Sequence, residues 1–236
     1  MIILCIETST TVCSAALCKD GMLIKQCINY EGSNHARLLP LDIQELLALA
    51  QKEQLSIDAV ALSEGPGSYT GLRIGTSTAK GLCYGLNIPL IPVPTLEVLC
   101  EAAKQNTEYN IQSTDLLCPL IDARRMEVYT LSEDGKARAV VVENEDSLYS
   151  LCEADSAPSE TRSIYYFGDG AAKCQKVLTK PNWLFLPNIV PEARYMPNLA
   201  EKILDNTRDN HVDIAYYEPY YLKQFIAARS HVKGLV

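Results

Sequence analysis

The order of predicted strands and helices in the first 105 residues restricts the fold more than any other feature of the chain. Short apolar runs predict five strands, over residues 2–6, 12–17, 22–28, 57–62 and 88–93. Lys19-Asp20-Gly21 is a hairpin signal between the second and third of these strands. Amphipathic stretches predict three helices, over about residues 34–51, 70–86 and 95–104. The chain therefore begins with a meander and continues with alternating helices and strands.

Short connections and right-handed crossovers favour one arrangement of these elements, a mixed five-stranded sheet with helices on its faces. By analogy of element order, this arrangement resembles the ribonuclease-H-like half-unit of the actin/sugar-kinase superfamily. We therefore predict an α/β chain of two lobes. Residues 1–105 form the first lobe, and residues 106–236 form a smaller, degenerate second lobe. The sequence leaves open whether residues after about Pro197 pack back on the first lobe.

The second lobe is predicted from shorter signals. Strands are expected over residues 116–121, 128–131, 137–142 and 164–167. Helices are expected over residues 171–178 and 199–206. The polar segment 106–114 is the best linker between the lobes.

The formal net charge of -8 argues against a chain that binds a nucleic acid by itself, because a polyanion needs a basic surface. The basic residues that cluster are C-terminal, and they form either a solvated tail or a contact to RNA or an acidic partner: Lys223, Arg229, His231 and Lys233. Nine cysteines without a C-x-x-C motif are typical of buried thiols in a reducing cytosol. Without a secretory signal or an apolar run of about 20 residues, we expect a cytoplasmic protein with no membrane contact.

The most informative segment is Ser63–Arg73, which reads SEGPGSYTGLR. Two glycines around a proline predict a sharp turn directly after a strand. Ser68 and Thr70 are both candidate N-caps of the helix that follows. Backbone N–H groups at such a helix start can bind an anion, although an ordinary strand-to-helix turn explains the pattern equally well. The segment lacks the G-K-[ST] of a Walker A loop.

The same segment carries a resemblance to a known family. GPGSYTGLRIG is similar to the GPGSFTGLRIG signature of the TsaB (YeaZ-type) family. Further segments resemble motifs of that family in the same order, namely Ile6–Thr10, Asn34–His35 with Leu38–Pro40, Pro89 with Thr95–Leu96, Asp122–Arg124 with Glu127–Tyr129, and Glu218–Leu222. Several motifs in the right order make the resemblance specific.

The resemblance implies a non-catalytic scaffold subunit in the formation of threonylcarbamoyladenosine in tRNA. The implied partners are the catalytic paralogue TsaD and a TsaE-type ATPase, with tRNA contacted indirectly and a homodimer as a further form. It implies no cofactor of the chain's own, with ATP and Mg²⁺ at a shared interface as a further expectation. The alternative is an autonomous ATP-dependent enzyme of the actin/sugar-kinase type.

Glu7 departs from the family pattern, because the family usually has Asp at the end of the first strand. In the superfamily that Asp helps to hold a magnesium nucleotide, and Mg²⁺ demands near-ideal octahedral geometry. The longer Glu side chain therefore weakens the case for nucleotide binding by this lobe. The residues predicted to contact an anion or nucleotide are Glu7, Thr8, Ser9, Gly67, Ser68 and Thr70.

No catalytic or metal-binding residue is predicted. The three histidines His35, His211 and His231 lack the H-x-x-x-H spacing of the paralogue's metal site, and His35 fits a local hydrogen bond. The charged cluster Asp122, Arg124, Arg125 and Glu127 is either an acid/base site or a salt-bridged strand end. The segment Gly168–Ala171 is either a degenerate nucleotide contact or a plain turn.

A partner surface is predicted on the first-lobe helices. Glycines in the helix 70–86 fall on one side at ~3.6 residues per turn, and each costs roughly 1 kcal/mol relative to alanine. The preceding helix is apolar on two sides. The alternative is that both sides face the chain's own core. The residues predicted to contact a partner are Leu38, Leu41, Leu49, Gly71, Gly75, Thr78 and Leu82, and Gly75→Leu is expected to weaken pairing without unfolding the chain.

Overall fold

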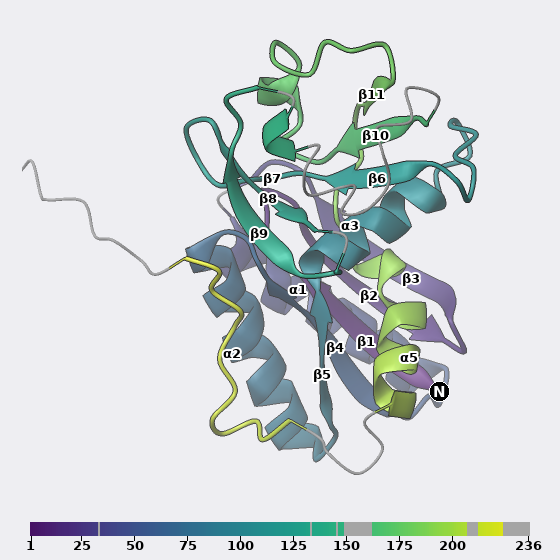
Figure 1. The fold of residues 1–236 in the computed structure, drawn as a ribbon. Coiled ribbons are helices and arrows are strands. Elements are labelled where there is room, and N and C mark those ends of the chain that lie inside the picture. Colours follow the sequence, from purple (N-terminus) through teal and green to yellow (C-terminus); the bar gives the residue numbers. More distant parts are fainter. Residues whose placement is uncertain (33, 133, 145, 149–161, 207–211, 224–236) are drawn as a thin grey trace, which may run out of the picture.

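The structure is a computed structural model that describes residues 1–32, 34–132, 134–144, 146–148, 162–206 and 212–223. Two lobes are stacked on one another (Figure 1), with the five-stranded sheet in the first lobe and two smaller sheets in the second. The α/β, two-lobed prediction is confirmed in these residues.

The first-lobe sheet has the strand order β3-β2-β1-β4-β5. Its strands are β1 (Ile2–Glu7), β2 (Cys13–Lys19), β3 (Met22–Asn29), β4 (Ala59–Gly65) and β5 (Leu90–Pro94). β1 pairs antiparallel with β2 and parallel with β4, which makes the sheet mixed. All six residues of β1 are buried, because helices cover both faces of the sheet.

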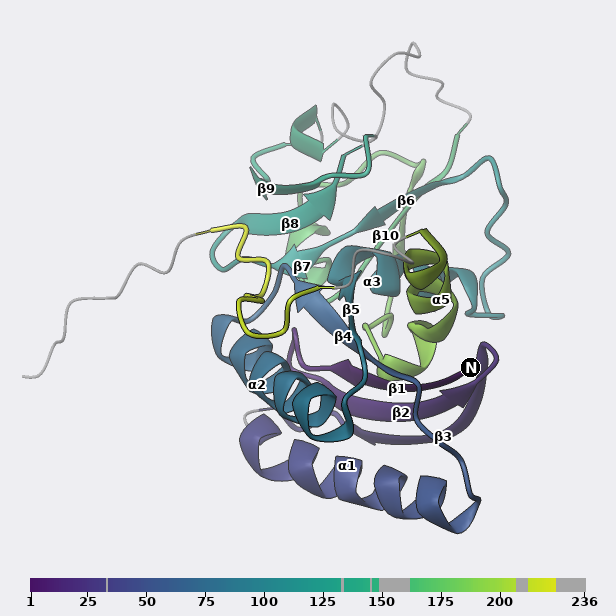
Figure 2. The ribbon, with the colours of Figure 1, turned by 90° about the horizontal axis from the view of Figure 1, so that it is seen from below.

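Two helices cover each face (Figure 2). α1 (His35–Lys52) and α2 (Tyr69–Leu86) pack on the face formed by residues such as Leu4 and Ile6. α3 (Thr95–Lys104) and α5 (Pro197–Asn206) pack on the opposite face, against Ile3 and Cys5. α5 therefore returns from the second half of the chain to the first-lobe sheet. This answers the question that the sequence left open.

The second lobe contains two three-stranded sheets. One is parallel, with the order β11-β10-β6, and consists of β6 (Leu116–Pro119), β10 (Ile164–Phe167) and β11 (Trp183–Leu186). The other is antiparallel, with the order β7-β8-β9, and consists of β7 (Ile121–Asp122), β8 (Glu127–Leu131) and β9 (Ala137–Val141). The 3-10 helix η2 (Ala193–Tyr195) then leads to α5.

Two predictions for the second lobe were wrong, and one strand was not predicted. The strand expected over 116–121 divides at Leu120, whose N–H bonds to Phe167 and whose carbonyl oxygen accepts from Gly170, so the chain changes sheets there. The short strand β11 was missed. The helix expected over 171–178 is a 3-10 turn, η1 (Ala172–Cys174), followed by further turns. Most of the acidic segment 143–162 lies outside the described residues.

The described C-terminal residues 212–223 run in an extended path beside α2 (Figure 1, yellow). Ile214 and Tyr217 pack against the core between α2 and the first-lobe sheet. Among the described helices, none combines the length and apolar character needed to cross a membrane.

Candidate functional site

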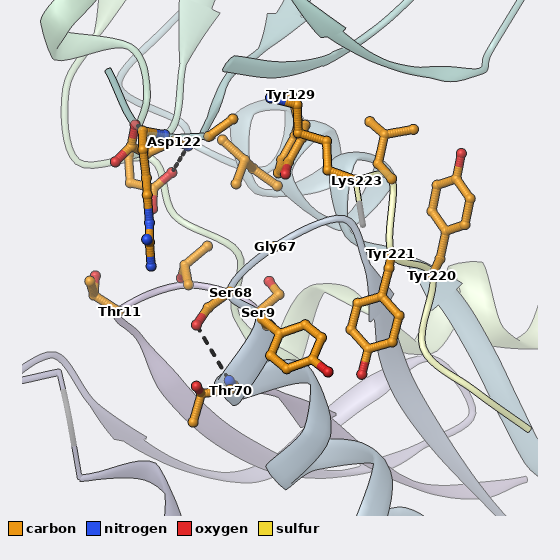
Figure 3. Close-up of a pocket in the computed structure, with 18 of the residues that line it drawn as sticks. Ser9, Thr11, Gly67, Ser68, Thr70, Asp122, Tyr129, Tyr220, Tyr221 and Lys223 are labelled. Carbon is orange, nitrogen blue, oxygen red and sulfur yellow. Dashed lines mark hydrogen bonds between the residues drawn. The ribbon is translucent and has the colours of Figure 1, made fainter. Parts of the chain in front are cut away.

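A cavity of about 720 Å³ lies between the lobes. On the first-lobe side it is lined by the turn after β1 and the starts of α1 and α2 (Figure 3). On the second-lobe side it is lined by β7 and the turn after it, by β8 and by the turn after β10. The C-terminal segment contributes residues 220–223 to its wall. We call this space the interlobe cavity.

The start of α2 forms the floor of the interlobe cavity on the first-lobe side. Ser68 is the N-cap, and its hydroxyl accepts a hydrogen bond from the Gly71 N–H at 3.3 Å. The Ser68 N–H donates to the Ser9 carbonyl oxygen at 2.6 Å, which ties the turn after β4 to the turn after β1. Ser68 is therefore the cap, and Thr70 lies in the first helical turn. Figure 3 shows Ser9, Ser68 and Thr70 around this helix start.

Three glycines allow the turn after β1 to approach α2. A Cβ at Gly67 would overlap the Ser9 carbonyl oxygen, and one at Gly71 would overlap that of Thr8. A Cβ at Gly75 would overlap the Thr8 hydroxyl and lie 3.1 Å from Leu62 Cδ1. Gly71 and Gly75 therefore face their own lobe, and their predicted place in a partner interface was wrong. The physical reason is that the atoms that approach these glycines, from Thr8 and Leu62, belong to this chain.

Glu7 and Thr8, which were predicted to contact an anion, do not line the interlobe cavity. Glu7 is fully buried, and its Oε1 accepts from the Ser9 N–H at 2.6 Å and the Ser9 hydroxyl at 2.5 Å. Burial raises the pKa of Glu7, while hydroxyls of Ser63 and Ser9 act in the opposite direction. Thr8 donates its hydroxyl to the Gly71 carbonyl oxygen at 2.8 Å. Both side chains therefore hold the turn after β1 in place.

The other four predicted anion contacts do line the interlobe cavity: Ser9, Gly67, Ser68 and Thr70. The start of α1 also reaches it through His35, which is buried. The His35 Nε2 atom is 3.0 Å from the Thr10 carbonyl oxygen, so this histidine makes a hydrogen bond, but to the turn after β1 and not to a local partner as expected.

The second lobe brings two carboxylates to the cavity, Asp122 and Asp169. Asp169 accepts from the Asp122 N–H at 2.9 Å, and burial raises its pKa. Asp122 forms an ion pair with Lys173, whose ammonium group also donates to the Glu127 carbonyl oxygen at 2.6 Å. Because Asp169 lines the cavity, the segment 168–171 lies beside it. A nucleotide contact by this segment, which was one of its two interpretations, stays a prediction.

The charged cluster after β7 is a salt-bridged strand end, but its cations are lysines. Asp122 pairs with Lys173, and Glu127 pairs with Lys223. Arg124 lines the cavity from the turn between β7 and β8. Sequence separation hid both lysine pairs, because Lys173 and Lys223 come from distant segments.

Sequence reasoning also missed an aromatic group at the cavity. Tyr69 and Tyr221 are in ring contact, with centroids 4.9 Å apart, and the guanidinium group of Arg73 lies 4.9 Å from the Tyr69 ring centroid. Tyr129 and Tyr220 also line the cavity. The sequence signal was present, since the chain has 13 tyrosines and only 3 phenylalanines, but it did not indicate a place.

The superfamily implies a magnesium nucleotide in this position, and the described residues do not fit the metal. The first-strand carboxylate, Glu7, bonds to Ser9 and stays outside the cavity lining. Of the two carboxylates that line the cavity, Asp122 is paired with Lys173. Within the described ranges, no group of three or more His, Cys, Asp or Glu side chains is placed to hold a metal ion.

The remaining residues of the predicted partner surface lie on α1 and α2. Leu41 is 56% exposed, whereas Leu38 and Leu49 are half-buried. The flank that carries Leu38 and Leu49 also carries Glu45, which pairs with Lys25 of β3, so this flank leans toward the chain's own sheet. On α2, Thr78 and Leu82 are half-buried, and further glycines on this helix are exposed. A partner role for these five residues stays a prediction.

Comparison with known proteins adds to this geometry. The family model TsaD, described as tRNA N6-adenosine threonylcarbamoyltransferase, matches residues 30–216. A curated protein of Haemophilus influenzae, named tRNA threonylcarbamoyladenosine biosynthesis protein TsaB, is 29% identical over 236 residues, which cover 94% of this chain and 93% of the relative. The chain belongs to the TsaB/YeaZ family.

TsaB proteins of the same name in Bacillus subtilis and Escherichia coli are 35% and 36% identical. Those two matches span about half of this chain and about half of each relative, 54% and 53%. A solved structure titled YeaZ from Pseudomonas aeruginosa superposes with a TM-score of 0.69 at 24% identity, over 94% of this chain and 99% of that one. At this identity the likeness shows the fold, which agrees with the two-lobed fold predicted from the order of strands and helices.

Proposed function

We propose that this chain is a non-catalytic subunit in the formation of threonylcarbamoyladenosine in tRNA, where it pairs with a catalytic TsaD-type paralogue. The names of its TsaB relatives and of the matching family support this pathway. The paralogue supplies the transfer chemistry in this proposal, and the present chain supplies a folded surface that positions it.

One observation supports the non-catalytic part of the proposal, namely the burial of the carboxylate at the end of β1. Glu7 is fully buried and accepts two hydrogen bonds from Ser9, so it braces the turn after β1 instead of pointing into the interlobe cavity. A carboxylate in this state is a structural group. The superfamily uses the same position for a metal nucleotide, so the change favours a supporting role over an autonomous ATP-dependent enzyme.

The pairing surface in this proposal is the outward side of α1 and α2. Leu41 on α1 and Tyr84 on α2 are 56% and 83% exposed, so both offer apolar surface to a partner. Added Cβ atoms at Gly81 and Gly85 would have no neighbour within 4 Å. Glycine without a neighbour inside a helix costs stability, and close approach of a partner helix compensates for that cost. Thr78 and Leu82 lie beside these glycines along α2.

The remaining partners follow from charge and from the family. A net charge of -8 disfavours direct tRNA binding by the lone chain, so tRNA is contacted through the paralogue. A TsaE-type ATPase completes the assembly, and ATP with Mg²⁺ binds at a shared interface in this proposal. A homodimer forms through the same surface when the paralogue is absent.

Reconstitution tests the proposed function. The chain, its TsaD-type paralogue and its TsaE-type ATPase are mixed with tRNA, ATP and a donor of the threonylcarbamoyl group, and modified adenosine is measured. We expect product only when chain and paralogue are both present, and no ATP turnover by the chain alone. ATP turnover by the pure chain that is lost in Glu7→Gln would support the autonomous enzyme and contradict the proposal.

A further inference from the structure

The C-terminal residues 212–223 form one wall of the interlobe cavity, and they are held unequally at their two ends. We call this segment the strap. It runs from beside the C-terminal part of α2 to the N-terminal part of the same helix (Figure 1). It has no regular strand or helix of its own among its described residues. Its position therefore depends on a few contacts that can be examined separately.

The first half of the strap is anchored on the first lobe. The Lys80 ammonium group on α2 donates to the carbonyl oxygens of Ala215 and Tyr217, both at 3.1 Å. Ile214 and Tyr217 pack against the first-lobe core, and burial raises the pKa of the Tyr217 hydroxyl. Removing this half would expose apolar surface and leave the Lys80 contacts unmade.

The second half of the strap crosses to the other lobe. The Tyr220 N–H donates to the Glu64 carbonyl oxygen at 2.7 Å, and Tyr221 contacts the Tyr69 ring. A Cβ at Gly65 would overlap the Tyr220 carbonyl oxygen, so glycine there allows the strap to lie against the end of β4. Beyond these contacts, Lys223 reaches the second lobe through its ion pair with Glu127 of β8.

The Lys223–Glu127 ion pair is the weaker end. The Lys223 side chain is 45% exposed and that of Glu127 is 19% exposed. Ion pairs between exposed side chains contribute little, because water screens them and two long side chains lose freedom. The Tyr217 end, by contrast, is held by burial. Opening should therefore begin at Lys223 and leave the anchored half in place.

We infer that the strap is a gate of the interlobe cavity that opens from its Lys223 end, losing the Lys223 ion pair first, then the Tyr221 ring contact and the Tyr220 hydrogen bond, with a hinge near Pro219. With the gate closed, Tyr220, Tyr221 and Lys223 complete the cavity wall beside the start of α2 (Figure 3). With the gate open, the lobes lose the ion pair that joins them through the strap, and the helix start at Ser68 becomes accessible from solvent. The anchored half keeps the gate attached to α2.

Amide hydrogen exchange of the full-length chain tests this inference. Lys223→Met removes the ion pair, and we expect peptides covering residues 218–223 to exchange about two- to fivefold faster, because the pair is partly exposed and contributes little. Peptides covering residues 212–217 should not change. The double variant Glu127→Lys/Lys223→Glu should restore the natural rate. Lys80→Met is the matched control, since it should loosen residues 212–217 instead. Unchanged exchange in Lys223→Met, or equal acceleration of both halves, would overturn the inference.

A second experiment measures how fast a small reagent enters the interlobe cavity. Ile121 is buried and lines the cavity, so Ile121→Cys reports entry of a small thiol reagent. We expect it to react about two- to fivefold faster when Lys223→Met is added. The native Cys118 is buried in the same lobe outside the cavity lining and serves as an internal control. Equal acceleration at Cys118 would indicate general loosening of the lobe and would contradict a gate.

Discussion

The two halves of α2 use the same residue type for opposite purposes. In the N-terminal half, Gly71 and Gly75 are buried, and the turn after β1 occupies the space where their side chains would be. In the C-terminal half, Gly81 and Gly85 have no atom within 4 Å of an added Cβ. The first pair lets the chain build its own cavity floor. The second pair leaves a helix surface open.

This contrast shows that a helical projection gives the side of a helix on which a residue lies but not which atoms face that side. All four glycines lie within a limited arc of the helix, so the sequence pattern treats them as one surface. The neighbouring atoms decide their roles, and the atoms closest to Gly71 and Gly75 belong to Thr8, which is distant in sequence. The comparison therefore predicts different outcomes for matched substitutions in the two halves.

The largest effect is expected in the buried half. Gly71→Ala and Gly75→Leu would each force an atom into space occupied by Thr8, so we expect a loss of about 2–3 kcal/mol in the free energy of unfolding, or no folded protein. Urea denaturation followed by circular dichroism measures this loss. A folded Gly75→Leu variant of natural stability would show that the turn after β1 does not press on α2.

A smaller loss is expected at the helix cap. Ser68→Ala removes the hydroxyl that accepts from the Gly71 N–H, which should cost about 1 kcal/mol. Thr70→Ala is the matched control, because Thr70 lies inside the first turn and does not cap the helix. Thermal denaturation of both variants compares them directly. Equal losses would mean that Ser68 is not the functional cap.

In the C-terminal half of α2, a substitution of glycine should raise the stability of the chain. Gly81→Ala places a methyl group in empty space and improves helix propensity, so we expect a gain of up to about 1 kcal/mol in the lone chain. The same denaturation assay detects it. A loss of stability at Gly81 would reveal an internal contact and would remove the contrast between the two halves.

The pH dependence of stability tests the role of Glu7, because Glu7 holds the turn after β1 that contacts Gly71. Burial raises its pKa above the ordinary 4.5, so the folded chain holds this proton more tightly than the unfolded chain. The stability that Glu7 contributes is therefore fully present below pH 4.5 and is lost as the pH rises through the raised pKa. Glu7→Gln should flatten this dependence and gain relative to the natural chain as the pH rises.

Denaturation curves of Glu7→Gln at several pH values measure this effect, with Glu53→Gln as an exposed control. A constant difference between Glu7→Gln and the natural chain across the range would show that Glu7 does not titrate there. The hydrogen bonds from Ser9 would then hold the carboxylate in one charge state.

Most of the first lobe could be predicted from the sequence, because its signals are local. The bounds of α3 (Thr95–Lys104) follow from periodicity, and N-cap chemistry narrowed the cap of α2 to Ser68 or Thr70, of which the structure has Ser68. The second lobe was harder, since its strands are short and Leu120 divides one expected strand between two sheets. The candidate site depends on contacts across more than 40 residues, such as Lys173 with Asp122 and Lys223 with Glu127, and no local pattern encodes them.

Pairing of Gly81→Leu with the TsaD-type protein of the same organism tests the central claim most directly. Because the space around Gly81 is open, the variant should fold normally, as judged by circular dichroism. Light scattering after size exclusion and titration calorimetry should show at least about tenfold weaker pairing, a difference of ~1.4 kcal/mol. Gln175→Leu, an exposed position on the second lobe, is the control and should pair normally. If folded Gly81→Leu pairs as tightly as the natural chain, the outward side of α2 is not the pairing surface and the account is wrong.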